Sequence, residues 1–110
     1  MARQPTNLLR GTLDLLILKA LTQRELHGLG VARRVGELTG GTFEVKPGSL
    51  FPALHRIEEA GWLVSKWGQS ENNRRAKYYA LSAAGKRQLK QEVEEWSRVS
   101  VAIESALRSA

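Results

Sequence analysis

The side chains that could do catalytic chemistry are few in this sequence and poorly spaced for it. The two histidines, His27 and His55, lie in different segments, and neither has the neighbouring ligands that a metal site needs. The acidic pairs Glu58–Glu59 and Glu94–Glu95 are adjacent within predicted helices, so the carboxylates of each pair diverge. The chain has no cysteine and no glycine motif that would cradle a nucleotide phosphate. We therefore expect no enzyme activity, no cofactor and no metal site.

The residues at 45–63, VKPGSLFPALHRIEEAGWL, are better suited to binding a phosphate backbone. Pro47, Gly48 and Ser49 stand at the front of a predicted helix, whose free N–H groups favour an anion. A start at Ser49, or a distorted first turn, is preferred to a start at Pro47, because Pro52 then loses no backbone hydrogen bond. Leu50, Leu54 and Ile57 are expected to face the core. The residues expected to face outward are Ser49, Phe51, Pro52, His55 and Arg56.

A second basic cluster lies in a turn-rich link between two β-prone runs, WLVSKW (62–67) and AKYYALS (76–82). Its cations are Arg74, Arg75 and Lys77, which would lie along a DNA backbone if this hairpin is a wing. The tryptophans that flank the first run, Trp62 and Trp67, are interpreted as packing residues.

The elements that must position these residues follow from periodicity. Helices are expected at about 8–22, 27–39, 49–60 and 82–107, with Ser82 as the N-cap of the last one. Three helices followed by a hairpin indicate a winged helix-turn-helix, a mainly α protein with a small β-hairpin (α+β class). We expect residues 1–82 to form the DNA-binding unit and residues 83–110 a C-terminal dimerisation helix.

The last predicted helix carries a heptad-like seam that a small domain cannot bury by itself. Another copy of the same helix is its simplest partner. Trp96 in this seam is either an aromatic residue of the dimer core or a wall on which a flat ligand stacks. The seam consists of Leu89, Val93, Trp96, Ser100, Ile103 and Leu107.

Composition limits the partners and the compartment. With 42% hydrophobic and 25% charged residues, the 110 residues suffice for one globular domain with a modest core. The formal net charge of +6 lies mostly before residue 86 and favours a polyanionic partner. No apolar run is long enough for a signal peptide or a membrane span. We expect a cytoplasmic protein with no membrane partner.

Three stretches resemble the PadR family of winged-helix transcriptional regulators, in its subgroup with a short C-terminal tail. LLRGTLDLLILKAL (8–21) is similar to the first helix of the family, and PGSLFPALHRIEEAGWL (47–63) to its recognition helix. RRAKYYALSAAGKRQL (74–89) resembles the second wing strand and the start of the last helix. The resemblance covers nearly the whole chain. It implies a homodimer that binds a palindromic operator in double-stranded DNA, usually as a repressor.

The resemblance also implies which residues do the binding. Leu9 and Leu13 of the first helix would assist the last helix in the dimer interface. Phe51 and Leu29 stand where the family commonly has tyrosines, so both hydroxyl groups are absent. The wing contacts would be Arg74, Arg75 and Lys77. The recognition-helix contacts would be Lys46, Gly48, Ser49, Phe51, Pro52, His55 and Arg56.

Two other functions stay open at this point. The protein could be a small-molecule-binding dimer whose DNA binding is secondary or lost, with Trp96 against a small aromatic effector. It could also be an adaptor that binds another protein through the seam. The residues do not decide between repression and activation, nor whether Phe51 contacts DNA or packs in the core.

Overall fold

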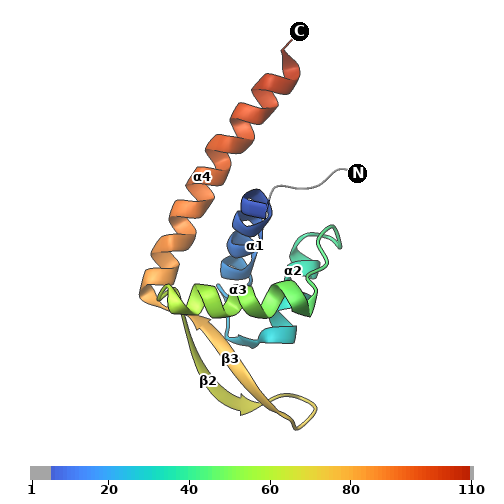
Figure 1. Ribbon diagram of the computed structural model, residues 1–110, viewed down its shortest axis with the longest axis vertical. Helices are drawn as coiled ribbons and strands as arrows, with labels where there is room; N and C mark the ends of the chain where they lie inside the picture. Colours follow the sequence, from blue (N-terminus) through green and yellow to red (C-terminus); the bar gives the residue numbers. More distant parts are fainter. Residues whose placement is uncertain (1–5, 110) are drawn as a thin grey trace.

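The fold is a three-helix unit followed by a small sheet and one long helix. The computed structural model describes residues 6–109, with side chains from residue 11 onward. Figure 1 shows the last helix projecting from one end of the molecule and the hairpin from the other. The predicted order of elements is confirmed. The helices are α1 (Thr6–Ala20), α2 (Gly28–Leu38), α3 (Pro47–Glu59) and α4 (Ala83–Arg108), and the strands are β1 (Leu26–His27), β2 (Leu63–Gln69) and β3 (Arg75–Leu81).

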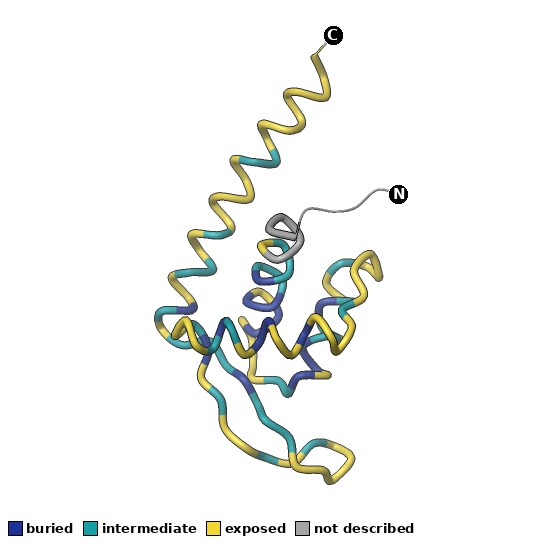
Figure 2. The backbone as a smooth tube through the Cα atoms, viewed as in Figure 1, coloured by how far each residue is buried: buried dark blue, intermediate teal, exposed yellow. Residues whose placement is uncertain are grey.

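One apolar core joins the first three helices to the sheet. Its side chains recur three or four residues apart in each helix and therefore share one face. In α3 the predicted core residues Leu50, Leu54 and Ile57 are fully buried. Figure 2 shows burial concentrated where α1, α2 and α3 meet, whereas most of α4 is exposed. The other core residues are Ile17, Leu18, Ala20, Leu21, Val31, Val35, Ala53, Leu63 and Tyr79.

Helix α3 begins two residues earlier than the preferred prediction. Pro47 is its first residue, and Lys46, with φ −85° and ψ 153°, is the N-cap. The Lys46 carbonyl accepts the Ser49 N–H at 3.0 Å. The prediction that Ser49 caps the helix is therefore wrong. Proline suits the first position, because its φ is already helical and an N–H there would have no partner within the helix. Pro52 consequently lies inside the helix, where the carbonyl of Gly48 receives no N–H from it.

The sheet has three antiparallel strands in the order β1-β3-β2. Strands β2 and β3 form the predicted hairpin, whose last pair is Gln69 opposite Arg75. The strands run further than expected, so the tip is only residues 70–74. Strand β1 has no counterpart among the predicted elements, because two residues carry no periodic pattern. It is defined by tertiary pairing, with His27 opposite Tyr78.

Helix α4 starts in close contact with the end of α3. As predicted, Ser82 is its N-cap, and its Oγ accepts the Gly85 N–H at 3.0 Å. The same hydroxyl donates to the carbonyl of Gly61 at 2.6 Å. Gly61 has a φ of +88°, which favours glycine where a helix ends. A Cβ on Gly85 would overlap the carbonyl oxygen of Trp62, so only glycine permits this approach.

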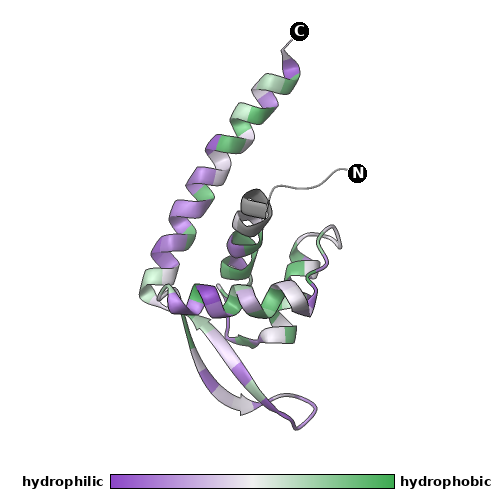
Figure 3. Ribbon diagram, viewed as in Figure 1, coloured by the Kyte–Doolittle hydropathy of each residue, from purple (hydrophilic) through white to green (hydrophobic). Residues whose placement is uncertain are grey.

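Beyond its first turns, α4 leaves the core. Leu89 still packs against the core, whereas Val93, Trp96 and Ile103 are about half exposed, at 45%, 49% and 51%. Figure 3 shows hydrophobic positions recurring along the projecting part of this helix. None of the helices in residues 6–109 is long and apolar enough to cross a membrane.

Candidate nucleic-acid interface

The front of α3 presents a continuous exposed surface. Gly48, Ser49, Pro52 and His55 are all exposed, while the residues between them that face α1 and α2 are buried. This is the predicted division of the helix, since residues three and four apart lie on one face. Nothing lies within 4 Å of where a Cβ on Gly48 would be, so the backbone there is open. Small side chains and accessible backbone allow a large polyanion to approach closely.

Lys46 and His55 border this surface, and each has a weak intramolecular partner. Lys46 Nζ lies 3.7 Å from a carboxylate oxygen of Glu44, and His55 Nε2 lies 3.3 Å from one of Glu59. All four side chains are largely exposed. Exposed ion pairs contribute about 1 kcal/mol or less. Lys46 and His55 can therefore exchange these carboxylates for a phosphate at little cost.

Arg56 differs from its neighbours, because its guanidinium forms an ion pair with a residue of another helix. Nη1 and Nη2 donate to the two carboxylate oxygens of Asp14 in α1 at 2.7 and 3.0 Å. Asp14 is only 7% exposed. The hydrogen bonds with Asp14 raise the pKa of Arg56 above its ordinary value. The sequence predicts that Arg56 faces outward toward DNA; its guanidinium turns to Asp14, while 37% of the side chain stays exposed, and the DNA contact stays a prediction.

Phe51 contacts both the protein and the solvent. Its ring lies against Gly28, the first residue of α2, where an added Cβ would collide with it. Phe51 is nevertheless 45% exposed. Packing and surface exposure are thus combined in one side chain, with part of the ring against α2 and the rest beside the front of α3.

The three predicted cations of the wing have different surroundings. Arg74 lies in the exposed tip. The guanidinium carbon of Arg75 lies 4.4 Å from the centroid of the Trp67 ring, a cation–π distance. Trp67 is interpreted from the sequence as a residue of hairpin and core packing; it is 58% exposed and therefore packs within the hairpin and not in the core. Lys77 Nζ lies 3.2 Å from Glu58 of α3, so its ammonium joins the wing to that helix.

Glu58 holds the base of the wing against α3. The Ser65 hydroxyl donates to Glu58 Oε2 at 2.5 Å, and Lys77 donates to the other oxygen. The hydrogen bond from Ser65, followed by that from Lys77, lowers the pKa of Glu58 below its ordinary value. The ionised carboxylate fixes where the wing stands relative to the front of α3.

A cleft of about 490 Å³ lies between the start of α2, Phe51 of α3 and the wing. Four cations line it, Arg33 from α2 and Arg74, Arg75 and Lys77 from the wing. One carboxylate, that of Glu71, also lines it. The excess of positive charge favours an anionic ligand. The apolar residues that line the cleft include Leu29, Phe51 and Trp67.

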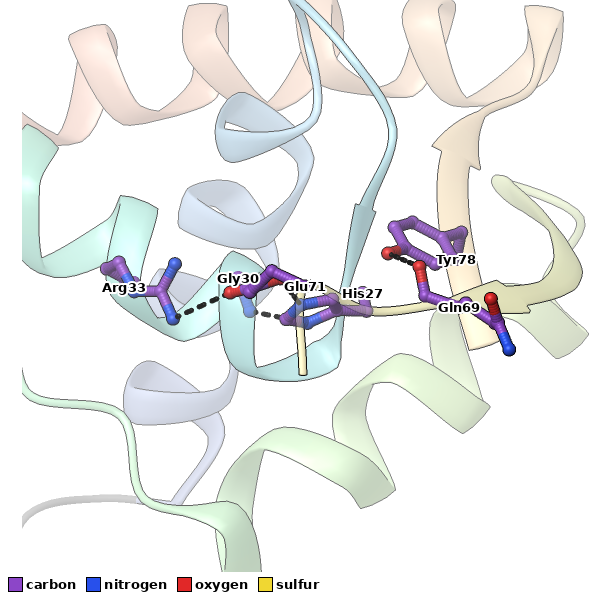
Figure 4. Close-up of polar contacts among 6 residues, drawn as sticks. All are labelled: His27, Gly30, Arg33, Gln69, Glu71 and Tyr78. Atoms are coloured by element: carbon purple, nitrogen blue, oxygen red, sulfur yellow. Dashed lines mark hydrogen bonds and ion pairs between the residues drawn. The ribbon is translucent and has the colours of Figure 1, made fainter. Parts of the chain in front are cut away.

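Polar contacts join the wing tip to the start of α2 among the residues that line this cleft (Figure 4). His27 Nδ1 accepts the Gly30 N–H at 3.1 Å, so His27 caps α2. In a neutral ring the proton is then on Nε2, which lies 3.3 Å from Glu71 Oε1. The other oxygen of Glu71 lies 3.8 Å from the Arg33 guanidinium. We call His27, Arg33 and Glu71 the wing latch.

Tyr78 supports the wing latch from the sheet. Its ring meets the His27 ring edge-on, with centroids 5.4 Å apart, and its hydroxyl donates to the Gln69 carbonyl at 2.7 Å. The pKa of Glu71 is lowered, first by its own backbone N–H and then by the hydrogen bond from His27. The latch therefore holds an ionised carboxylate in an otherwise basic wing tip.

The residues that tie the elements together were not among the predicted site residues. They are Asp14, His27, Glu58, Trp67 and Glu71 in the pairs described above. Asp14 gave a signal, because it is the one acidic residue in the apolar run at 13–21. The other four have ordinary sequence surroundings, and only the tertiary structure shows their partners.

The predicted dimer residues fall into two groups. Leu13 and Leu89 are partly buried and pack against the core of their own chain. Leu9 lies outside the described side chains. The free part of the seam therefore begins at Val93 and includes Trp96, Ser100, Ile103 and Leu107 on the projecting part of α4.

Known proteins with the same arrangement are transcriptional regulators. Residues 17–91 match the transcriptional regulator PadR-like family. The transcriptional regulator Rv3488 of Mycobacterium tuberculosis is 35% identical over 74 residues, which are 67% of this chain and 66% of that protein. A transcriptional regulator from Clostridium thermocellum has a TM-score of 0.80 at 26% identity, covering 91% of this chain and 97% of that one. A PadR-like transcriptional regulator from Bacillus cereus has a TM-score of 0.78 at 27% identity, covering 96% and 100%.

Proposed function

The chain belongs to the PadR-like family of transcriptional regulators, and from this premise we propose that it is a homodimeric repressor of transcription that binds a palindromic operator. The family consists of regulators rather than enzymes. We propose that residues 1–82 form the DNA-binding unit and residues 83–110 the dimerisation helix. The proposed partner is double-stranded DNA in the cytoplasm.

The observation that carries this proposal is the cleft between α3 and the wing. In a helix-turn-helix protein, the front of the second helix of the motif enters the major groove. A DNA strand beside that groove would then pass between α3 and the wing, where Arg33, Arg74, Arg75 and Lys77 line the cleft. The charge of the cleft and its position next to the exposed front of α3 both support this placement.

The exposed residues divide into two proposed roles. Lys46, Arg74 and Arg75 would contact phosphates and supply most of the affinity, which depends on salt. Ser49 and His55 would meet base edges in the major groove and supply sequence preference. The small or rigid residues Gly48 and Pro52, together with part of Phe51, would set how closely the backbone of α3 approaches the DNA.

Dimerisation is supported by the free part of the seam on α4. Val93, Trp96 and Ile103 are each about half exposed in a single copy, at 45%, 49% and 51%. Together with Ser100, they recur at three- and four-residue spacing on a 26-residue helix that projects from the core. A second copy of α4 would bury this stripe, and a two-fold symmetric protein matches a palindromic operator.

The test is a titration of the protein against the DNA upstream of its own gene at two salt concentrations. We expect a complex that prefers this DNA over unrelated duplex and weakens as salt rises. The absence of a preferred complex, or an affinity that does not depend on salt, would contradict the proposal.

Matched variants separate the two roles. Arg74→Ala is expected to weaken binding to every duplex and to reduce the slope of log affinity against log salt by about 0.9 for each copy, or about 1.8 for the dimer. Ser49→Ala is expected to change the preference between duplexes while leaving that slope unchanged. Arg98→Ala removes the same charge from the exposed surface of α4, away from the cleft, and should change neither property.

A small-molecule response is a second candidate function, and the exposure of Trp96 favours it. A half-exposed indole on the seam would line any cavity that remains between two copies of α4. A small aromatic effector that prefers one dimer geometry would change operator affinity reciprocally. Planar aromatic compounds should reduce operator affinity in the wild-type protein. If they reduce it equally in Trp96→Ala, this role for Trp96 is contradicted.

A further inference from the structure

Trp67 lies on the wing with most of its surface in solvent. It is 58% exposed, although a large aromatic side chain on a strand usually packs. It stands opposite Lys77 in the hairpin, on the face of β2 that also carries Ser65, the partner of Glu58 in α3. Side chains alternate between the two faces of a strand, so Trp67 points toward the cleft side of the sheet. Stability of the isolated fold does not explain this placement.

Arg75 is the neighbour that stacks on the Trp67 ring. It lies two residues before Lys77 on β3 and so shares the face of Trp67, and its guanidinium carbon is 4.4 Å from the ring centroid. Within residues 11–109, Lys77 pairs with Glu58 and Arg33 with Glu71, whereas no carboxylate pairs with Arg75. The charge of Arg75 is thus held in the cleft by an aromatic face alone.

Stacking on a ring leaves the donors of a guanidinium free. Its five N–H bonds lie in the plane of the group, and a phosphate is bound through that plane. An ion pair with a carboxylate would occupy those donors, but an indole face does not. The ring also reduces the number of rotamers that a long exposed side chain samples, which lowers the entropy lost on binding.

We propose that Trp67 is a positioning residue for DNA binding, which holds the Arg75 guanidinium with its N–H groups toward a backbone phosphate. This inference rests on the proposed function and deepens it. It assigns to an exposed tryptophan on β2 the task of orienting a cation on β3. The ligand is one phosphate of the strand that enters the cleft.

The test is a double-mutant cycle with Trp67→Leu and Arg75→Ala, measured as DNA affinity over a range of salt. The probe is a duplex that the wild-type protein selects from a random library. In the wild-type background, Trp67→Leu should weaken binding about fivefold. In the Arg75→Ala background it should change binding by less than about twofold. Although Trp67→Leu removes no charge, it should reduce the salt slope by up to about 0.9 for each copy, or about 1.8 for the dimer, as Arg75→Ala does.

Three controls exclude a merely structural role. Trp67→Phe keeps an aromatic face and should recover most of the affinity and the slope. Val64→Ala removes an apolar side chain that is 54% exposed on the other face of β2, and it should leave DNA binding unchanged. Thermal unfolding of each variant shows whether the wing and core remain folded.

Each outcome is decisive. An equal loss from Trp67→Leu in both backgrounds, or an unchanged salt slope, overturns the positioning role while wild-type binding still supports the proposed function. No effect of Trp67→Leu on affinity also overturns it. If the wild-type protein selects no duplex at all, the proposed function fails first and this inference falls with it.

Discussion

Asp14 and Glu92 are acidic side chains near each other, and they differ in how their charge is compensated. Asp14 receives two hydrogen bonds from Arg56 at 2.7 and 3.0 Å. Glu92 receives one from the Gln88 amide at 3.0 Å. Burial raises the pKa of Glu92 above its ordinary value, and the charge of Asp14 adds to this despite the Gln88 hydrogen bond. The two carboxylates therefore differ in how far their hydrogen bonds compensate for burial.

For the pair of Asp14 and Arg56, we expect Arg56→Met to destabilise the protein more than Asp14→Asn does. Arg56→Met leaves the buried carboxylate of Asp14 without a partner, at a cost of about 3 kcal/mol in the free energy of unfolding. Asp14→Asn leaves a guanidinium that is 37% exposed and can reach water, at a cost of about 1 kcal/mol. Urea unfolding measures both. Equal losses, or a larger loss from Asp14→Asn, would argue against this account.

Glu92→Gln is expected to stabilise the protein at neutral pH and to lose that advantage in acid. Because the folded state raises the pKa of Glu92, the native protein holds this proton more tightly than the unfolded chain does. The ionised form is therefore penalised above the folded-state pKa, and the penalty is absent below roughly pH 4. Glu58→Gln is the control, because the lowered pKa of Glu58 predicts a loss of stability at neutral pH that also disappears in acid. Unfolding curves at several pH values separate the two.

At the scale of elements, side-chain contacts add to the backbone pairing of β1 with β3 in orienting the wing. The hairpin is joined to α3 at its base through Glu58 and to α2 at its tip through the wing latch. His27 belongs to both α2 and the wing, because one ring nitrogen caps the helix and the other contacts Glu71. The wing therefore depends on α2 for its position beside α3.

His27→Asn should release the wing tip without destabilising α2. Asparagine is a good N-cap residue and can accept the Gly30 N–H, but it is too short to reach Glu71. We expect faster hydrogen exchange of the Ser70 and Asn73 N–H groups, which close the tip at 2.8 and 2.9 Å, with little change in Tm. His27→Ala, the control, removes cap and latch together and should cost about 1 kcal/mol. Unchanged exchange in His27→Asn would show that the latch does not hold the tip.

At the scale of the whole molecule, a single copy leaves the seam on α4 unpacked. The chain extends 57 Å along its longest axis, largely because α4 projects beyond the core. A helix with an apolar stripe gains little by projecting into water. The proposed second copy gives this stripe a partner and at the same time sets the spacing between two copies of α3.

Ile103→Glu is expected to convert the proposed dimer to monomer and to weaken operator binding. The variant places two like charges, one from each copy, in an apolar contact at the two-fold axis. At about 2 kcal/mol or more for each buried charge, the free energy of dimerisation becomes less favourable by several kcal/mol. Ser105→Glu, on the exposed side of α4, adds the same charge outside the seam and should leave the dimer intact. Sedimentation equilibrium measures the mass. A monomeric wild-type protein, or a dimer that tolerates Ile103→Glu, would refute the role of the seam.

The sequence alone determined the order of elements, the buried face of α3 and the projecting last helix. Helical periodicity, the Ser82 cap and the glycine stop at Gly61 are local, so a single chain segment carries their signal. The tertiary structure decided which polar side chains meet. Arg56 has an outward position by periodicity, yet it turns to Asp14 because a buried carboxylate 42 residues away requires a partner. Tryptophan is a residue type that usually packs, but Trp67 lies exposed with its ring against Arg75. Contacts across a hairpin depend on strand register, which the local sequence pattern does not show.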